Sequence, residues 1–234
     1  MSAWKQKRFW EQVQVIEAAD GFTVELDGRA VKTPAKAGLF LPSRAMAEAI
    51  AVEWEAQKEA VNPNTMPCTR SANAAIDKVR IQHAEVADML ADYGDSDLLC
   101  YRAETPRELV SRQNDLWDPA LDWAESALGV RLLKRQGLLH KRQEAEALQT
   151  LRAKVHALSA FQLAAFHDLV SMSGSLILGF AAAENWRSVG EIWTLSRLDE
   201  LWQEEQWGPD DEAQAEAEIK RQAFLHAKRF YDFC

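Results

Sequence analysis

The histidine at position 167 is followed directly by an aspartate, and these two residue types can share a proton in acid–base catalysis. Of the five histidines in the chain, His167 alone has a carboxylate immediately beside it. Adjacent residues of a helix point in different directions, and no second ligand stands three or four residues away, as a helical metal site requires. The pattern therefore favours a structural histidine.

Other catalytic patterns fail on residue type. The interval from Gly174 to Gly179 matches the glycine spacing of a phosphate-binding loop, but Phe180 stands where the lysine must reach the phosphates. The alternative to a binding protein is an enzyme whose site is assembled from residues distant in sequence, around His167, Asp168 and Arg197. We expect a non-enzymatic protein with no catalytic residue, no metal and no cofactor.

Two features point to binding of a protein partner. Nine tryptophans are many for this length, and tryptophan is over-represented in protein interfaces, although a tryptophan-rich core explains most of them as well. Between Arg197 and Lys220 every charged residue is acidic. These residues are Asp199, Glu200, Glu204, Glu205, Asp210, Asp211, Glu212, Glu216 and Glu218. A solvated helical face and a partner-facing patch explain this run about equally well.

The composition excludes several classes of protein. The chain is 47% hydrophobic and 27% charged, which is typical of a globular protein, and its formal net charge of −9 disfavours nucleic acid as a partner. The first residues lack an apolar stretch long enough for a signal peptide, and no segment is long enough to cross a bilayer. The three cysteines form no CxxC pair and suit a reducing compartment. We expect a cytoplasmic protein without membrane insertion, and a monomer when free.

The first forty residues predict strands. Residues 22–26 and 29–33 flank Asp27 and Gly28, a dipeptide typical of a tight hairpin, and Val13 and Val15 alternate with polar neighbours ahead of it. Residues 39–41 predict a third short strand. Ser43 then predicts the start of a helix, because Met46, Ile50 and Trp54 follow at four-residue spacing.

From about residue 69 onward the pattern is helical. Thr105, Ser159 and Ser188 each precede a Glu or Gln by three residues, which predicts three helix starts with capping boxes. The dipeptide Asp118-Pro119 predicts that a helix restarts there and ends at Gly129, with a short strand over residues 130–133.

A single central helix is expected over residues 160–184. Its small residues recur every four positions and predict close contact with another helix. They are Ser171, Ser175, Gly179 and Ala183.

The expected fold class is α+β, with a small N-terminal β-rich lobe over residues 1–100, which includes one or two helices. A mainly α-helical C-terminal domain follows over residues 101–234. No internal repeat is evident.

A series of short motifs in this order resembles the assembly chaperones for the α subunit of the F-type ATP synthase catalytic head. The motifs are Gly21-Phe22, Leu26-Asp27-Gly28-Arg29, Lys32-Thr33-Pro34, Glu53-Trp54, Gln57, Met66-Pro67, Thr69-Arg70, Asn73, Asp97-Leu98-Leu99-Cys100-Tyr101-Arg102, Trp117-Asp118-Pro119, Ser173-Gly174-Ser175, Ser196-Arg197-Leu198-Asp199-Glu200 and Gln206-Trp207-Gly208. Each is weak alone, but together they run through nearly the whole chain.

The resemblance implies an N-terminal β-containing lobe, a C-terminal helical domain and a task without catalysis. Members bind the unassembled α subunit, shield the surface that β later covers, and leave when the α/β hexamer forms. Mitochondrial members carry a targeting extension, so the resemblance implies a bacterial cytoplasmic member. It also implies a partner-binding role for Trp54, Asp199 and Glu200, with Glu204 one turn further on. Trp54 shares a stripe with Met46 and Ile50, so a core role is at least as well supported for it.

Overall fold

The computed structural model describes residues 7–137 and 140–234. The described chain forms two compact units. The first contains the chain up to His83 together with Ser159–Ala165 and Arg229–Cys234, and the second contains Ala84–Leu158 and Phe166–Lys228. The predicted division into a β-rich lobe over residues 1–100 and a helical domain over residues 101–234 stays a prediction.

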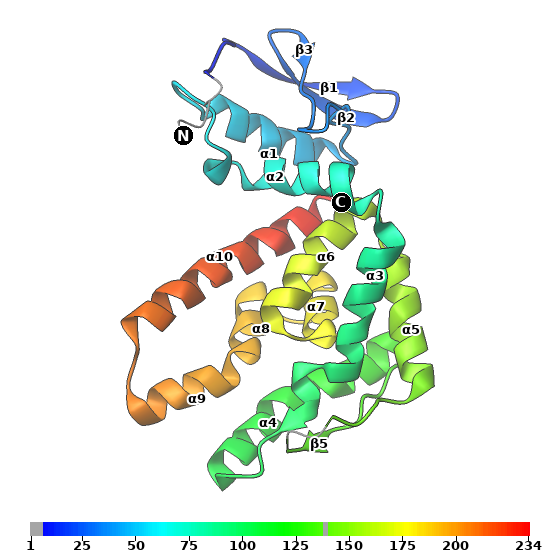
Figure 1. Ribbon diagram of the computed structural model, residues 1–234, viewed down its shortest axis with the longest axis vertical. Helices are drawn as coiled ribbons and strands as arrows, with labels where there is room; N and C mark the ends of the chain where they lie inside the picture. Colours follow the sequence, from blue (N-terminus) through cyan, green and yellow to red (C-terminus); the bar gives the residue numbers. More distant parts are fainter. Residues whose placement is uncertain (1–6, 138–139) are drawn as a thin grey trace. The chain divides into compact units, whose positions relative to one another are not determined.

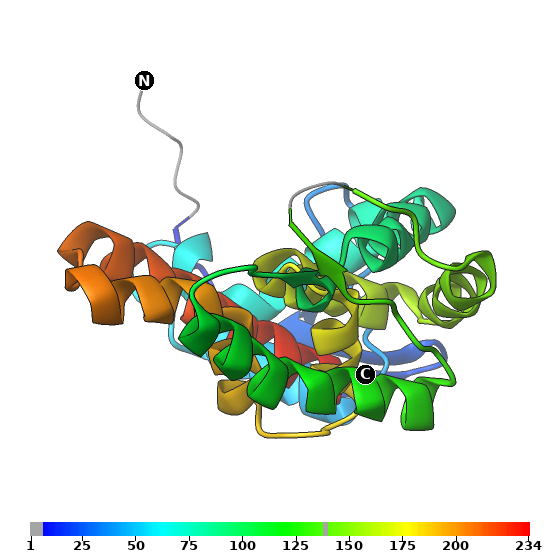
Figure 2. The ribbon, with the colours of Figure 1, turned by 90° about the horizontal axis from the view of Figure 1, so that it is seen from below.

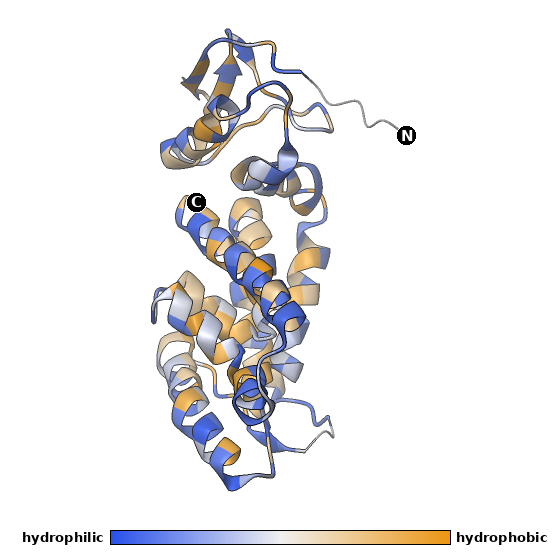
Figure 3. Cartoon of the chain, turned by 90° about the vertical axis from the view of Figure 1, so that its left-hand side faces the viewer, coloured by the Kyte–Doolittle hydropathy of each residue, from blue (hydrophilic) through white to orange (hydrophobic). Residues whose placement is uncertain are grey.

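The first unit contains a three-stranded antiparallel sheet in the order β1-β2-β3. Its strands are β1 (Val13–Ala18), β2 (Gly21–Leu26) and β3 (Arg29–Ala30). Asp27 and Gly28 join β2 to β3 with φ angles of 49° and 74°, so the predicted hairpin is confirmed, although its second strand is shorter than expected. Figure 3 shows hydrophobic and hydrophilic residues sharing these strands, as a sheet with one covered face requires.

The prediction of a strand over residues 39–41 is wrong. Leu41 makes only an isolated bridge to Phe22, and Lys32 makes another to Gly38. Leu39 and Leu41 are nevertheless fully buried. Burial of these two side chains, rather than a hydrogen-bonded ladder, accounts for the apolar pattern.

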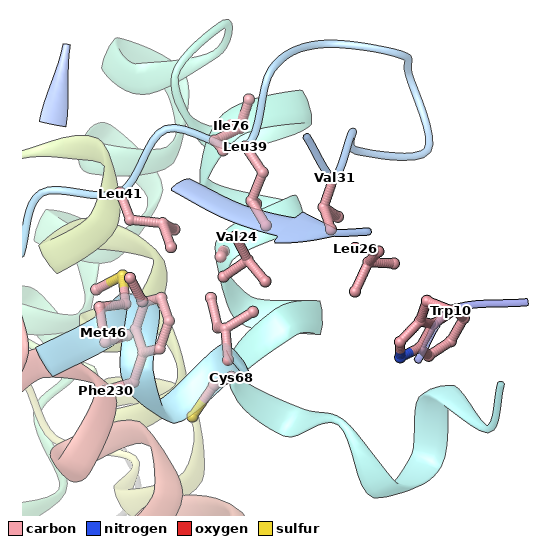
Figure 4. Close-up of a cluster of buried hydrophobic side chains, with 14 residues drawn as sticks. Trp10, Val24, Leu26, Val31, Leu39, Leu41, Met46, Cys68, Ile76 and Phe230 are labelled. Carbon is pink, nitrogen blue, oxygen red and sulfur yellow. The ribbon is translucent and has the colours of Figure 1, made fainter. Parts of the chain in front are cut away.

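The core of the first unit forms between the sheet and the helices α1 (Arg44–Glu55) and α2 (Pro67–Ala74). Ser43 caps α1 by accepting a hydrogen bond from the Met46 backbone N–H at 3.2 Å, as predicted. Figure 4 shows Met46 of α1 and Cys68 of α2 beside Phe230, which comes from the other end of the chain. The last turn of the chain therefore completes this core.

The second unit is built mainly of helices (Figures 1 and 2). The helices that it contains wholly or in part are α3 (His83–Ala91), α4 (Arg107–Trp123), α5 (Ala145–His156), α6 (Ala160–Ser173), α7 (Leu176–Ala183), α8 (Val189–Ser196), α9 (Leu198–Trp207) and α10 (Asp211–Asp232). Two short strands, β4 (Tyr101–Arg102) and β5 (Arg135–Gln136), pair in parallel. Short 3₁₀ and π segments complete the chain; they are Pro63–Thr65, Ala75–Val79, Asp92–Ser96, Leu98–Cys100 and Ala124–Leu128.

Two of the three predicted capping boxes are confirmed. Ser159 and Gln162 exchange hydrogen bonds at the start of α6, and Ser188 and Glu191 do so at the start of α8. The prediction of a capping box at Thr105 is wrong. α4 begins at Arg107, its capping residue is Pro106, and no side chain of the described chain caps it.

The predicted helix restart at Asp118-Pro119 is also wrong. α4 runs through Pro119, and the Asp118 carboxylate lies 2.9 Å from the Arg102 guanidinium and 2.8 Å from the Lys134 ammonium instead of capping a helix. Gly129, with φ of 70°, ends the π segment that continues α4, as expected. The strand predicted over residues 130–133 is displaced, since β5 covers only Arg135–Gln136.

The single helix expected over residues 160–184 is two helices. Gly174 adopts φ of 68°, which ends α6, and Ser175 begins α7 by accepting a hydrogen bond from the Leu178 backbone N–H. The break separates Ser171 from Gly179, so the four small residues do not form one ridge. A Cβ atom on Gly179 would lie only 2.6 Å from Val170 Cγ2, so α6 and α7 pack closely here.

The fold is an N-terminal antiparallel sheet followed by a mostly helical chain, which confirms the predicted α+β class. Among residues 7–137 and 140–234, no helix is both long enough and apolar enough to span a bilayer.

Candidate partner-binding site

The three predicted acidic residues lie together on α9. Asp199 is half-buried, and its carboxylate accepts a hydrogen bond from Gln113 Nε2 of α4 at 2.8 Å. Gln113 is itself 1% exposed, and its Oε1 accepts from the Ala103 backbone N–H at 2.8 Å. Asp199 therefore fixes α9 to α4, because removing it would leave a buried amide donor unsatisfied.

Glu200 is more accessible. It lies 3.1 Å from the Arg197 guanidinium across one helical turn, and its side chain is 47% exposed. The Arg197 guanidinium also lies 5.9 Å from the centre of the Trp193 ring. Glu200 is the more exposed partner of this pair, so its carboxylate remains accessible to a cation of another protein.

Glu204 has no basic partner among the described residues. Its carboxylate accepts a long hydrogen bond, 3.4 Å, from Gln214 Nε2 of α10. The next residue, Glu205, is held by the Arg112 guanidinium through two contacts of 2.5 and 2.8 Å, which lowers the pKa of Glu205. Glu205 is therefore paired with a cation of the same protein, whereas Glu204 pairs with none among the described residues.

Trp54 lies in the first unit, whereas α9 lies in the second. The Trp54 ring packs edge-on against the Trp10 ring with centroids 5.3 Å apart, and the Trp54 residue is half-buried beside the first unit's core. Both indole N–H groups are buried and have no hydrogen-bond partner among residues 7–137 and 140–234. These contacts support a core role for Trp54, while its part in binding stays a prediction.

The residues of the enzyme alternative do not assemble into a site. His167 Nδ1 lies 3.0 Å from Asp168 Oδ1, so these neighbours do contact each other, contrary to the expectation from helix geometry, and this hydrogen bond raises the pKa of His167. Arg197 instead contacts Glu200 and Trp193. Within the described part of the chain, no group of three or more His, Cys, Asp or Glu side chains could hold a metal ion.

A small hollow of about 320 Å³ lies beside the start of α9. Asp199 and Glu200 line it together with Arg197 and with Lys220 of α10. Two carboxylates and two cations line the hollow, so its charges largely balance each other and it offers no concentrated site for an ion.

Two residues with unusual surroundings were not among the site residues predicted from the sequence. Asp97 is fully buried and accepts hydrogen bonds from Ser175 Oγ at 2.7 Å and from the Ile177 backbone N–H at 3.0 Å. Burial raises its pKa to about 6, against the opposing effect of these hydrogen bonds. The burial of a carboxylate depends on distant packing, so the local sequence offered only the weak signal of a capping aspartate.

The other is Trp207, which is 81% exposed at the end of α9. A helical projection could have found it, because Glu200, Glu204 and Trp207 recur at i, i+4 and i+7 and so share one face of α9. The structure therefore adds an accessible aromatic side chain to the acidic face.

Comparisons with known proteins identify the family. The sequence profile of the family described as ATP12 chaperone protein matches residues 7–125. The crystal structure of Atp12 from Paracoccus denitrificans is 45% identical in sequence and superposes with a TM-score of 0.96, covering 99% of both chains. A protein from Agrobacterium tumefaciens is 41% identical with a TM-score of 0.92, covering 97% of this chain and 85% of that chain.

A curated relative, protein atp12, mitochondrial, from Schizosaccharomyces pombe, is 27% identical over 219 residues, which are 88% of this chain and 75% of the relative. The similarity thus extends over both units of the fold. The chain belongs to the ATP12 chaperone family and is a non-enzymatic assembly factor of ATP synthase.

Proposed function

We propose that this protein binds the unassembled α subunit of ATP synthase and shields its β-facing surface until the α/β hexamer forms. The observation that carries the proposal is the acidic face of α9, where Glu200 is half exposed and Glu204 lacks a cation among the described residues. Such a face attracts basic groups on another protein and speeds the encounter with it.

The two acidic residues have different parts in this proposal. Glu204 makes the direct contact with a basic group of the α subunit, because it has no ion pair to lose among the residues that the structure describes. Glu200 exchanges Arg197 for a partner cation, while Asp199 positions α9 through Gln113. Trp54 acts through the fold of the first unit, where it supports Trp10.

The chaperone acts in the cytoplasm as a monomer when free, without a cofactor and without nucleic acid. Its net charge of −9 repels polyanions and favours basic surfaces. A holdase also needs a contact weak enough to hand its client on, and an interface with exposed ion pairs dissociates faster than a large apolar one.

Co-expression with the α subunit of the same organism, without β, tests the proposal. The chaperone should keep α soluble and co-purify with it on affinity capture, whereas α expressed alone should aggregate. The variant Glu204→Lys should lower capture by about 10-fold, because it replaces an attraction by a repulsion. Aggregation of α with no capture by the wild-type chain would refute the function.

A further inference from the structure

The first half of α10 has almost no packing. Every residue from position 211 to 216 is exposed, and so are residues 218–220. An isolated helix of this length is only marginally stable in water, because most helical stability in proteins comes from burial of an apolar face. This segment needs another source of order.

Local interactions supply that order. Asp210 Oδ1 caps α10 by accepting hydrogen bonds from the backbone N–H groups of Glu212 at 2.9 Å and Ala213 at 3.2 Å. One turn apart, Glu216 pairs with Lys220 at 2.7 Å and Glu218 with Arg221 at 2.7 Å. Local interactions therefore supply most of the order of this helix, beside the 3.4 Å hydrogen bond from Gln214 Nε2 to Glu204 of α9, so the helix is preformed and accessible to a partner.

Large apolar side chains are exposed on the same segment. Trp207 is 81% exposed at the turn into α10, and Ile219 of α10 is 71% exposed. Figures 1 and 2 show the α9–α10 connection lying away from α3 and α5 of the same unit. An exposed tryptophan on a preformed element is the usual anchor of a protein interface, because it buries a large area at low entropic cost.

The charges around this segment indicate the kind of partner that it would bind. In the part of the chain that the structure describes, Glu204, Asp210, Asp211 and Glu212 form no ion pair, whereas Glu205, Glu216 and Glu218 each have a basic partner. Carboxylates without an ion pair among the described residues thus precede and follow Trp207 in the sequence. Like charges so close together are unfavourable unless cations from another molecule neutralise them.

We propose that the acidic arm, residues 200–222, is a docking surface for a basic segment of the ATP synthase α subunit, with Trp207 inserted into an apolar pocket between its lysines or arginines. The inference rests on the proposed function and extends it from α9 to α10. A cation beside the pocket would also stack on the Trp207 ring. Nucleic acid and anionic lipid do not fit this surface, since their charge has the same sign.

The first test compares two exposed apolar residues in the full chain. Trp207→Ala should accelerate dissociation of the purified chaperone–α complex by about 30-fold or more, as expected for a central anchor. Ile81→Ala is the matched control, because Ile81 is 75% exposed and lies outside the arm. The rate is measured by exchange of fluorescently labelled chain against excess unlabelled chain.

The second test compares two pairs of exposed acidic residues, each in the first turn of a helix. The double variant D211K/E212K should weaken capture of α by about 10-fold or more and reduce its sensitivity to NaCl. The control E85K/E146K changes the same number of charges in the first turns of α3 and α5 and should bind as the wild type does. Circular dichroism and the thermal midpoint confirm that each variant is folded.

The outcomes separate this inference from the proposed function. If wild-type chain captures α and both arm variants dissociate as slowly as wild type, the arm is not the docking surface, although the chaperone function stands. If wild-type chain fails to capture α, both are refuted. If sedimentation shows a wild-type dimer that Trp207→Ala converts to a monomer, a second copy of this chain occupies the arm instead.

Discussion

Trp54 and Trp10 form an edge-to-face pair whose two indole N–H groups are both buried and find no hydrogen-bond partner in the described part of the chain. Trp54→Ala removes the ring that covers Trp10, so it should lower the free energy of unfolding by about 2–4 kcal/mol. Urea denaturation measures this change. Trp207→Ala is the control, because a side chain that is 81% exposed should alter stability by less than about 0.5 kcal/mol. Trp54 would be a binding contact rather than a core residue if its loss abolished capture of α at unchanged stability.

Asp97 joins the start of α7 to the chain ahead of β4 through hydrogen bonds from Leu99, Ser175 and Ile177. Burial raises its pKa to about 6, above the ordinary value for an aspartate. The folded protein therefore binds a proton at this position more tightly than the unfolded chain does. As a result, the stability due to this group increases as pH falls from about 7 to about 4.

The variant Asp97→Asn tests this effect. Asparagine cannot be protonated in this range, and its amide would face the Ile177 backbone N–H with a donor, so the variant should be less stable at every pH. The stability difference between wild type and variant should widen by about 2 kcal/mol from pH 7 to pH 4. Urea denaturation of both proteins between pH 7 and pH 4 measures this difference in unfolding free energy. A difference that does not change with pH would show that Asp97 keeps its ordinary pKa.

At the scale of elements, the sequence predicted what local patterns determine. The hairpin at Asp27-Gly28 and the caps at Ser43, Ser159 and Ser188 depend on residues a few positions apart, and all four are confirmed. The acidic residues of α9 were also correctly expected to share one helix. Local reasoning succeeded there because the interacting groups are near neighbours in the chain.

The errors arose where distant residues decide the structure. The helix expected over residues 160–184 breaks at Gly174, where Ser175 Oγ donates to the buried carboxylate of Asp97 from a distant part of the chain. α4 runs through Pro119, and the Asp118 carboxylate pairs with Arg102 and Lys134 instead of capping a new helix. The exposure of Trp207 likewise depends on what does not pack against it. A helical projection places Trp207 on the acidic face of α9, but local patterns do not give these contacts with distant residues.

The close contact between α6 and α7 gives an element-scale prediction. Gly179→Ala would place a Cβ atom 2.6 Å from Val170 Cγ2 inside a buried contact, so it should destabilise the protein by about 1–3 kcal/mol despite the higher helix propensity of alanine. Gly190→Ala in α8 is the control, because no described atom outside its chain neighbours and its own helix backbone lies within 4 Å of the added Cβ, and it should stabilise by up to about 1 kcal/mol. Thermal denaturation measures both. Equal effects would mean that α6 and α7 are not closely packed at Gly179.

The helical order of the acidic arm before binding gives a second prediction at the scale of elements. Ala215→Gly removes no contact, since Ala215 is exposed, but it lowers the helix propensity of the arm by about 1 kcal/mol. Dissociation from α should therefore be about 5-fold faster, with faster hydrogen exchange over residues 211–222 and an unchanged global unfolding free energy. Ala153→Gly in α5 carries the same propensity cost at an exposed position and should leave dissociation unchanged. An Ala215→Gly variant that dissociates like the wild type would show that the order of the arm is not used in binding.

At the scale of the whole molecule, a chaperone that covers the β-facing surface of α must compete with β for it. The two proteins cannot then occupy one α subunit together, so β should displace the chaperone in proportion to its concentration. Adding purified β to the chaperone–α complex should release free chaperone as a monomer, as resolved by size-exclusion chromatography with light scattering. The chaperone should also be missing from finished ATP synthase.

Competition also predicts how the arm variants respond. Because Trp207→Ala weakens only the chaperone side of the exchange, less β should be needed for half-release, in the same ratio as the increase in the dissociation constant. The control Ile81→Ala should require as much β as the wild type does. A stable complex that contains α, β and this chain together would contradict shielding of the β-facing surface, because it would place the chaperone on another face of α.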